Sequence, residues 1–137
     1  MATATTQYLG KLRCSNLHLQ SGTEIFTDAP TDNQGMGSAF SPTDLCALSL
    51  TTCIVTTMGI YAKSNGFEIL SIEADTTKQM GVDPRRIEKI SALIQIKLSA
   101  DASDRQKEGL QRITHICPVS RSLHPELIQD IVLQFIE

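Results

Sequence analysis

Two cysteines have the surroundings best suited to chemistry in this chain of 137 residues. Cys53 lies inside the uncharged stretch 45–61, and Cys117 opens the segment Cys-Pro-Val-Ser at 117–120. A buried cysteine is most often a packing residue, because cysteine is among the most buried residue types. Redox chemistry is the alternative, since a thiol oxidised to a sulfenic acid can condense with a second thiol to form a disulfide.

The spacing of the cysteines restricts which thiols can pair. Cys46 and Cys53 are seven residues apart on one expected helix, which separates them by about 10 Å along its axis. A disulfide requires Cα atoms within about 7 Å of each other. The partner of Cys53 within the chain is therefore either Cys14 or Cys117.

Cys117 has the more favourable local sequence. Because it precedes Pro118, it can cap a new helical turn, whose amide groups favour a thiolate. His115 and Arg121 are close in sequence and can add positive charge. Cys53 lies in the middle of an apolar segment, where burial raises the pKa of a thiol, so its activation requires a nearby cation or base.

The composition argues against several functional classes. A net charge of −3 and a pI near 5.6 argue against a nucleic-acid partner. The cysteines and histidines lack Cys-x-x-Cys and His-x-x-x-His spacings, and no glycine-rich phosphate loop is present, so we expect no metal and no cofactor. The first residues lack the pattern of a secretory signal, which favours a cytoplasmic protein with free thiols.

The apolar stretch 45–61 is expected to be a core helix and not a membrane span. It contains five hydroxyl residues and is shorter than the roughly 20 apolar residues that a bilayer requires. Because it carries no charge, we expect it to be buried on nearly all sides.

The first half of the chain predicts short strands followed by one long helix. The expected strands are Tyr8–Cys14, Leu17–Gln20 and Glu24–Thr27, with a turn-rich loop at 28–38. Ser41 is a good N-cap for a helix from Pro42 to about Ser64, and Asn65-Gly66 is a typical stop.

The second half predicts three strands, a helix and a short helical turn. Strands are expected at 67–78, 90–98 and 128–136, the second with a clean period of two. Ser103 and Gln106 form a capping-box pattern for a helix that starts near Asp104. With a turn or short helix at 119–123, the pattern is that of a single α+β domain over residues 1–137.

Several segments resemble the OsmC/Ohr family, the osmotically inducible protein C and organic hydroperoxide resistance proteins. Ser-Pro-Thr-Asp-Leu at 41–45 and Ser-Leu-Thr-Thr-Cys at 49–53 are similar to the family's central helix. Cys-Pro-Val-Ser at 117–120 resembles its second cysteine motif. The segments 27–30 and 32–35, just before the helix, are also similar, and the resemblance covers nearly the whole chain.

The resemblance implies an OsmC-like α+β fold. In this fold an antiparallel sheet packs on a long buried central helix that carries Cys53, with a second helix beside it, in an intertwined homodimer. It also implies a thiol-dependent peroxidase that reduces organic, lipid-type hydroperoxides. Cys53 would attack the peroxide, Cys117 would resolve the sulfenic acid into a disulfide, and a dithiol such as a lipoyl group would be the reductant.

The sequence leaves open which residues would activate Cys53. Members of the family carry a glutamate near the start of the central helix, paired with an arginine from the N-terminal strands. Thr43 stands at the glutamate position, and Asp44 follows it, rotated by about 100° around the helix. Arg13 and Lys11 are the candidate cations before the helix.

Two other functions remain as alternatives to the peroxidase. The first is a non-catalytic OsmC-fold protein that binds an apolar small molecule, and the second is a thiol redox sensor without turnover. The surroundings of Cys53 distinguish the peroxidase from the binding protein. A cation within hydrogen-bond reach of Cys53 and Cys117 close by would support catalysis, whereas wholly apolar surroundings with the two sulfurs far apart would favour binding.

Overall fold

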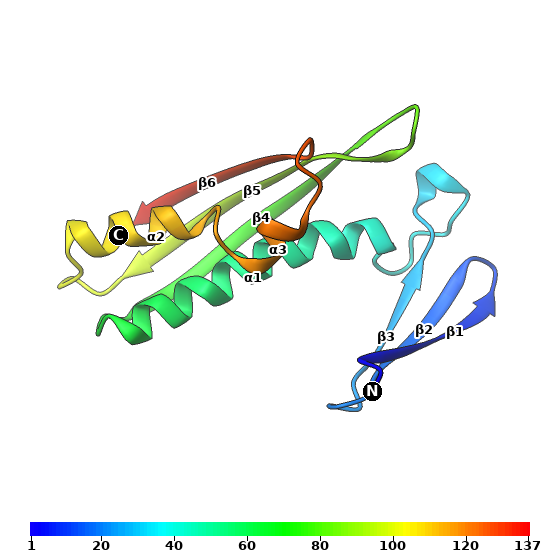
Figure 1. Ribbon diagram of the computed structural model, residues 1–137, viewed down its shortest axis with the longest axis horizontal. Helices are drawn as coiled ribbons and strands as arrows, with labels where there is room; N and C mark the ends of the chain where they lie inside the picture. The colour runs from blue at the N-terminus through cyan, green and yellow to red at the C-terminus, as the bar shows by residue number, and fades with distance from the viewer. The chain divides into compact units, whose positions relative to one another are not determined.

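The computed structural model describes residues 1–137, and the chain forms two compact units, residues 1–46 and 47–137. Each unit contains its own three-stranded sheet, and the helices follow the first sheet in sequence (Figure 1). The α+β class expected from the sequence is confirmed. The expectation of one domain over 1–137 stays a prediction.

The first unit contains an antiparallel sheet in the order β1-β2-β3. Its strands are β1 (Ala4–Gly10), β2 (Arg13–His18) and β3 (Glu24–Asp28). The expected single strand Tyr8–Cys14 is wrong, because the chain reverses within it. Gly10, Lys11 and Leu12 have positive φ angles of 84°, 55° and 65°. Only glycine adopts such angles readily, so the two residues after it gave no turn signal.

The loop after β3 contains a short 3-10 helix, η1 (Thr31–Asn33), and folds closely on itself. A Cβ atom added to Gly35 would lie 1.6 Å from the Ala29 carbonyl oxygen. Position 35 therefore requires glycine, because backbone atoms cannot give way as a flexible side chain can.

Helix α1 (Pro42–Ser64) has the bounds predicted from its caps. The Ser41 N–H donates to Asp44 Oδ2 and the Asp44 N–H donates to Ser41 Oγ, each at 3.0 Å, which is a reciprocal capping box. At the other end the chain leaves the helix through Gly66, whose φ is 70°.

The second unit contains a mixed sheet in the order β4-β5-β6. Strands β4 (Ile69–Gly81) and β5 (Arg86–Leu98) are antiparallel, whereas β6 (Ile128–Ile136) runs parallel to β5. The sheet is thus not wholly antiparallel as expected. The connection from β5 to β6 contains α2 (Asp104–Ile113) and α3 (Pro118–Ser122), and a crossover of this length permits parallel pairing.

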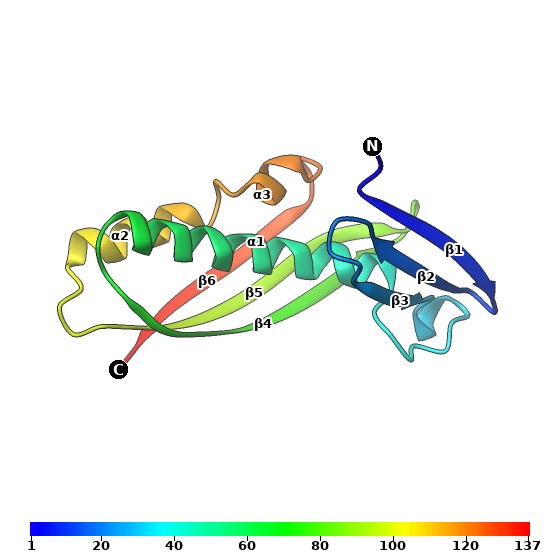
Figure 2. The ribbon, with the colours of Figure 1, turned by 90° about the horizontal axis from the view of Figure 1, so that it is seen from below.

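Helices α1 and α2 lie on the same face of the β4-β5-β6 sheet (Figure 2). The predicted alternation on β5 is confirmed, since every second residue from Ile90 to Ile96 is buried toward the helices. Ser103 and Gln106 form the expected capping box of α2. The fully or nearly buried core consists of Ala47, Leu50, Ile54, Met58, Ala62, Phe67, Ile90, Ala92, Ile94, Ile96, Leu110, Ile113, Cys117 and Leu133.

Within one chain, α1 is buried along one side only, so the expected burial on nearly all sides is not met. Thr52, Thr56, Gly59 and Ile60 form an exposed strip without charge. The helix is long and apolar enough to cross a membrane by length and composition alone, with a mean hydropathy of 1.7 over its best window. Core helices pass the same test, and six residues of α1 are buried, so we interpret it as a core helix.

Candidate redox site

The structure brings the two predicted thiols together. Cys53 lies in the middle of α1 and is half-buried, whereas Cys117 precedes α3 and is fully buried. The side chain of Cys53 interacts with the Cys117 thiol through a hydrogen bond and through its charge. All four cysteines are free, so this is the dithiol form of the site.

Cys117 caps α3, as predicted from the proline that follows it. Its Sγ accepts a hydrogen bond from the Ser120 backbone N–H at 3.4 Å, and Pro118 occupies the first turn of the helix. The Cys117 carbonyl also accepts from the Arg121 N–H at 3.1 Å. The thiol therefore lies at the start of α3. Tertiary packing, and not the local sequence, brings this helical turn beside α1.

The capping turn does not make Cys117 a thiolate. Burial raises the pKa of Cys117 above its ordinary value of 9.0, and the hydrogen bond and charge of Cys53 raise it further. The backbone N–H groups of Ser120 and Val119 lower the pKa, but burial outweighs them. The expected effect of the amide groups is therefore confirmed, although it does not set the direction of the net pKa shift.

The cations expected near Cys117 do not contribute to this shift. His115 and Arg121 are both exposed, and the causes of the raised pKa of Cys117 are burial, Cys53 and nearby backbone groups. Although both residues are close to Cys117 in sequence, their charges do not affect its pKa, because both side chains are exposed to solvent.

Ser120 and Gln129 are site residues for which the sequence indicated no separate role. The Ser120 hydroxyl donates to Gln129 Oε1, and Gln129 Nε2 donates to the Ser120 carbonyl oxygen at 3.0 Å. Ser120 belongs to the cysteine motif, and this membership was a sequence signal for its place in the site. Gln129 on β6 had no such signal, because only the fold brings its side chain to α3.

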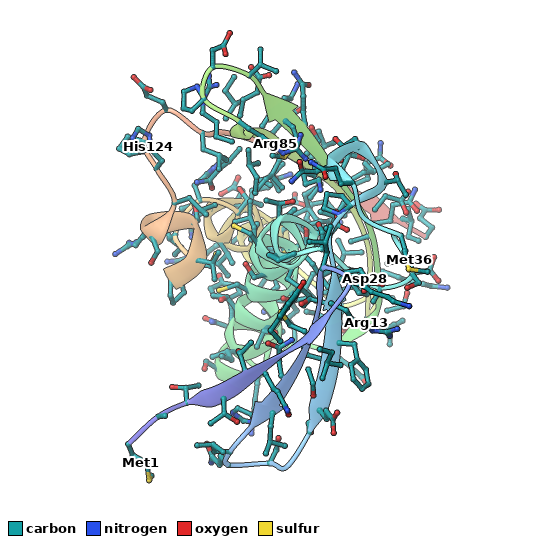
Figure 3. All side chains as sticks on the ribbon, turned by 90° about the vertical axis from the view of Figure 1, so that its right-hand side faces the viewer. Met1, Arg13, Asp28, Met36, Arg85 and His124 are labelled. Atoms are coloured by element: carbon teal, nitrogen blue, oxygen red, sulfur yellow. The ribbon has the colours of Figure 1, made fainter.

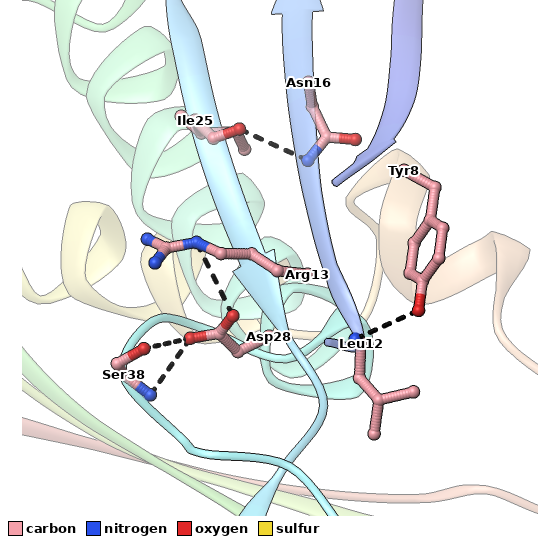
Figure 4. A network of polar contacts seen from close by, with 7 residues as sticks. All are labelled: Tyr8, Leu12, Arg13, Asn16, Ile25, Asp28 and Ser38. Carbon is pink, nitrogen blue, oxygen red and sulfur yellow. Dashed lines mark hydrogen bonds and ion pairs between the residues drawn. The ribbon is translucent and has the colours of Figure 1, made fainter. Parts of the chain in front are cut away.

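Arg13 has a carboxylate partner in its own unit. Its Nε lies 3.7 Å from Asp28 Oδ1 (Figure 3). Its guanidinium lies 4.9 Å from the centre of the Phe26 ring. Asp28 is buried and also accepts hydrogen bonds from the Ser38 N–H and hydroxyl (Figure 4). The sequence placed Asp28 in the turn-rich loop at 28–38 and did not indicate its pairing with Arg13.

Thr43 and Asp44 both take part in the cap of α1. The Asp44 carboxylate accepts from the Ser41 N–H, and Thr43 Oγ1 lies 3.2 Å from Ser41 Oγ. These contacts explain their residue types without catalysis. A role of Thr43, Asp44 or Arg13 in activating Cys53 stays a prediction.

The comparisons with known proteins identify the family. The family profile described as OsmC-like protein matches residues 35–129. A crystal structure from Psychrobacter arcticus is 42% identical, with a TM-score of 0.88, over 98% of this chain and 96% of that one. The chain belongs to the OsmC-like family. The name of the Psychrobacter protein assigns it, provisionally, to osmotic stress induction and a detoxification response.

More distant OsmC-like structures share the fold. An organic hydroperoxide resistance protein OsmC from Legionella pneumophila is 15% identical, with a TM-score of 0.68, over 100% of this chain and 98% of that one. OhrB of Bacillus subtilis, also an organic hydroperoxide resistance protein, is 18% identical, with a TM-score of 0.63, over 99% and 98%. No curated protein matches the chain.

Proposed function

We propose that this OsmC-like protein is a thiol peroxidase that reduces organic hydroperoxides. The interaction between the Cys53 and Cys117 side chains carries the proposal, because a two-thiol cycle requires adjacent sulfurs. The names of the Legionella and Bacillus relatives, which refer to organic hydroperoxide resistance, support the substrate class.

Two steps of the proposed cycle are carried out by residues of this chain. The Cys53 thiolate attacks one oxygen of the O–O bond, which releases an alcohol once a proton is supplied and leaves a Cys53 sulfenic acid. Cys117 then attacks the sulfenic sulfur, which forms the disulfide and releases water. A dithiol reductant, for which a lipoyl group is the candidate, would reduce the disulfide and restore both thiols.

The difference between the thiols suits this division of roles. Cys53 is half-buried and accessible to a small substrate, whereas Cys117 has no exposed surface. The charge of Cys53 raises the pKa of Cys117, so Cys117 keeps its proton while Cys53 is a thiolate. Loss of that charge on oxidation of Cys53 removes one of the causes that keep Cys117 protonated.

A thiol titration tests the proposal. One equivalent of cumene hydroperoxide should remove two thiols per chain from the wild type and produce one Cys53–Cys117 disulfide, identified by peptide mapping. Cys53→Ser should abolish hydroperoxide consumption, and Cys117→Ser should leave a sulfenic acid on Cys53 that a dimedone probe detects.

Cys46→Ser is the matched control, because Cys46 lies on the same helix and should be dispensable. Retention of full activity in Cys53→Ser would refute the assignment of the nucleophile. Consumption of peroxide with no loss of Cys117 thiol would refute the assignment of the resolving residue.

We also propose that the protein acts as a homodimer. The β1-β2-β3 sheet and the exposed strip of α1 (Thr52, Thr56, Gly59 and Ile60) leave apolar side chains uncovered, which is unusual for a monomer. On the sheet these exposed side chains include Tyr8, Leu17, Ile25 and Phe26.

A further inference from the structure

Gln129 connects α3 to the sheet beneath it. The side-chain amide donates to the Ser120 carbonyl oxygen at 3.0 Å and accepts from the Ser120 hydroxyl, so both of its polar ends are used on one residue. Gln129 lies opposite Ile90 in the β5–β6 ladder, and Ile90 is fully buried. The amide therefore belongs to a strand that pairs with the buried part of β5.

Ser120 contacts both Gln129 and the Cys117 thiol. Its backbone N–H donates to Cys117 Sγ at 3.4 Å, and its hydroxyl also lies 3.5 Å from the His115 carbonyl oxygen. A continuous series of hydrogen bonds thus runs from Gln129 through Ser120 to Cys117, whose thiol in turn interacts with Cys53.

A segment as short as α3 depends on such support. It has five residues, and an isolated helix of that length is unstable in water. Disulfide formation between two thiols gains its rate from their fixed proximity, which a loosened α3 would reduce. The Ser120 N–H bond also lowers the pKa of Cys117 against the effect of burial, and the resolving sulfur attacks as a thiolate.

We propose that Gln129 is a positioning residue for the resolving step and acts on Cys117 through Ser120. The inference rests on the proposed two-thiol cycle. In the step concerned, the Cys117 sulfur forms a bond to the Cys53 sulfenic sulfur, the S–O bond breaks, and the hydroxyl leaves as water with the Cys117 proton. Gln129 touches neither sulfur, so its effect falls on the rate of this step and not on the first attack on peroxide.

The test measures the two steps separately in Gln129→Ala and Gln129→Glu. Gln129→Glu keeps the acceptor for the Ser120 hydroxyl and loses the donor to the Ser120 carbonyl, at nearly unchanged size. Dimedone trapping reports the sulfenic acid, and mass spectrometry after quenching with N-ethylmaleimide reports the disulfide. We expect disulfide formation to slow about tenfold or more in Gln129→Ala and less in Gln129→Glu, with an unchanged rate of sulfenic acid formation.

Gln134→Ala is the matched control. Gln134 is the same residue type on the same strand, exposed, and joined to Gln95 at 3.3 Å, away from α3. Its rate of disulfide formation should equal that of the wild type. An equal slowing in Gln134→Ala would overturn the inference, because the effect would then belong to the strand as a whole.

The pH profile separates positioning from general loosening. If the Ser120 N–H bond to Cys117 weakens, the midpoint of the pH–rate profile for disulfide formation should move to higher pH in both Gln129 variants. A lower rate at every pH with an unmoved midpoint would overturn this part of the inference. Gln129→Glu provides the measurement if Gln129→Ala does not fold.

An oxidant other than peroxide tests the role of Gln129 separately from the proposed peroxidase activity. The azo oxidant diamide joins two thiols into a disulfide and is itself reduced to the hydrazine, which takes up both protons. Slower diamide-driven closure in Gln129→Ala, without peroxide consumption by the wild type, would support the positioning role and refute the peroxidase. Wild-type peroxide turnover with unchanged closure in both Gln129 variants would refute the positioning role alone.

Discussion

The two thiols of this OsmC-like protein differ because their surroundings differ. Cys117 is fully buried at the start of α3, and burial is the largest cause of its raised pKa. The hydrogen bonds of the capping turn oppose this shift without reversing it. At the residue scale, solvent exclusion is therefore the main reason that the Cys117 thiol keeps its proton to a higher pH than an ordinary thiol.

The raised pKa of Cys117 predicts a loss of stability at alkaline pH. The folded-state pKa lies above the ordinary value of 9.0, so the fold favours the protonated thiol. This contribution is fully present below about pH 9 and is lost as pH rises through the folded-state pKa, by at most about 1.4 kcal/mol per pH unit. Urea unfolding of the reduced protein between about pH 7 and 10.5 measures it.

Cys117→Ser supplies the reference for that measurement, since lysines and tyrosines also titrate in this range. The free energy of unfolding of the wild type should fall more steeply with pH than that of the variant. Parallel curves for the two proteins would show that Cys117 titrates alike in the folded and unfolded chains, against the expectation.

At the element scale, the approach of α1 to α2 depends on a glycine. Gly109 is buried inside α2, and a Cβ atom added there would lie 1.9 Å from the Tyr61 hydroxyl oxygen and 2.3 Å from the ring carbon that bears it. The Tyr61 ring also packs edge-on against Phe67, with ring centres 5.8 Å apart, so it cannot easily turn away. Gly109 thus permits close packing of α2 against α1, the helix that carries Cys53.

Gly109→Ala should destabilise the protein although alanine favours helices by about 1 kcal/mol. Overpacking against Tyr61 should lower the free energy of unfolding by about 1–3 kcal/mol, measured by urea unfolding. Gln111→Ala, at an exposed position of the same helix, should change it by less than about 0.5 kcal/mol. A stabilised Gly109→Ala variant would show that Tyr61 moves without cost.

At the scale of the whole molecule, the single chain exposes apolar side chains on α1. Ile60 on the exposed strip of α1 is 62% exposed, and no charged residue interrupts that strip between Thr52 and Ile60. The same helix would be buried on more of its sides if a second copy of the chain packed against it. The proposed dimer would account for the absence of charged residues from the stretch 45–61 of α1.

Ile60→Lys should therefore shift the protein toward monomer, because a charge buried in an interface without a partner is costly. Size-exclusion chromatography with light scattering measures the mass, and the 15.0 kDa chain makes monomer and dimer easy to distinguish. Val82→Lys is the control, since Val82 is apolar and 78% exposed in the β4–β5 turn. A monomeric wild type at micromolar concentration would contradict the dimer.

The sequence predicted correctly those helix ends that are set by capping residues at the ends themselves. Ser41, Pro42 and Gly66 predicted the bounds of α1, and Ser103 with Gln106 predicted the start of α2, because caps act within one turn of the helix. The reversal at Gly10–Leu12 escaped prediction, since left-handed angles at Lys11 and Leu12 are imposed by the strands that pair on either side.

The sequence by itself determined the family resemblance, the α+β class and the two thiols worth testing, because each of these rests on residue types and their spacing. Only the tertiary structure decided that β6 runs parallel to β5, that Asp28 is the partner of Arg13, and that Gln129 supports Ser120. It also decided the direction in which the pKa of Cys117 shifts, since burial and hydrogen bonding depend on which segments the fold brings together.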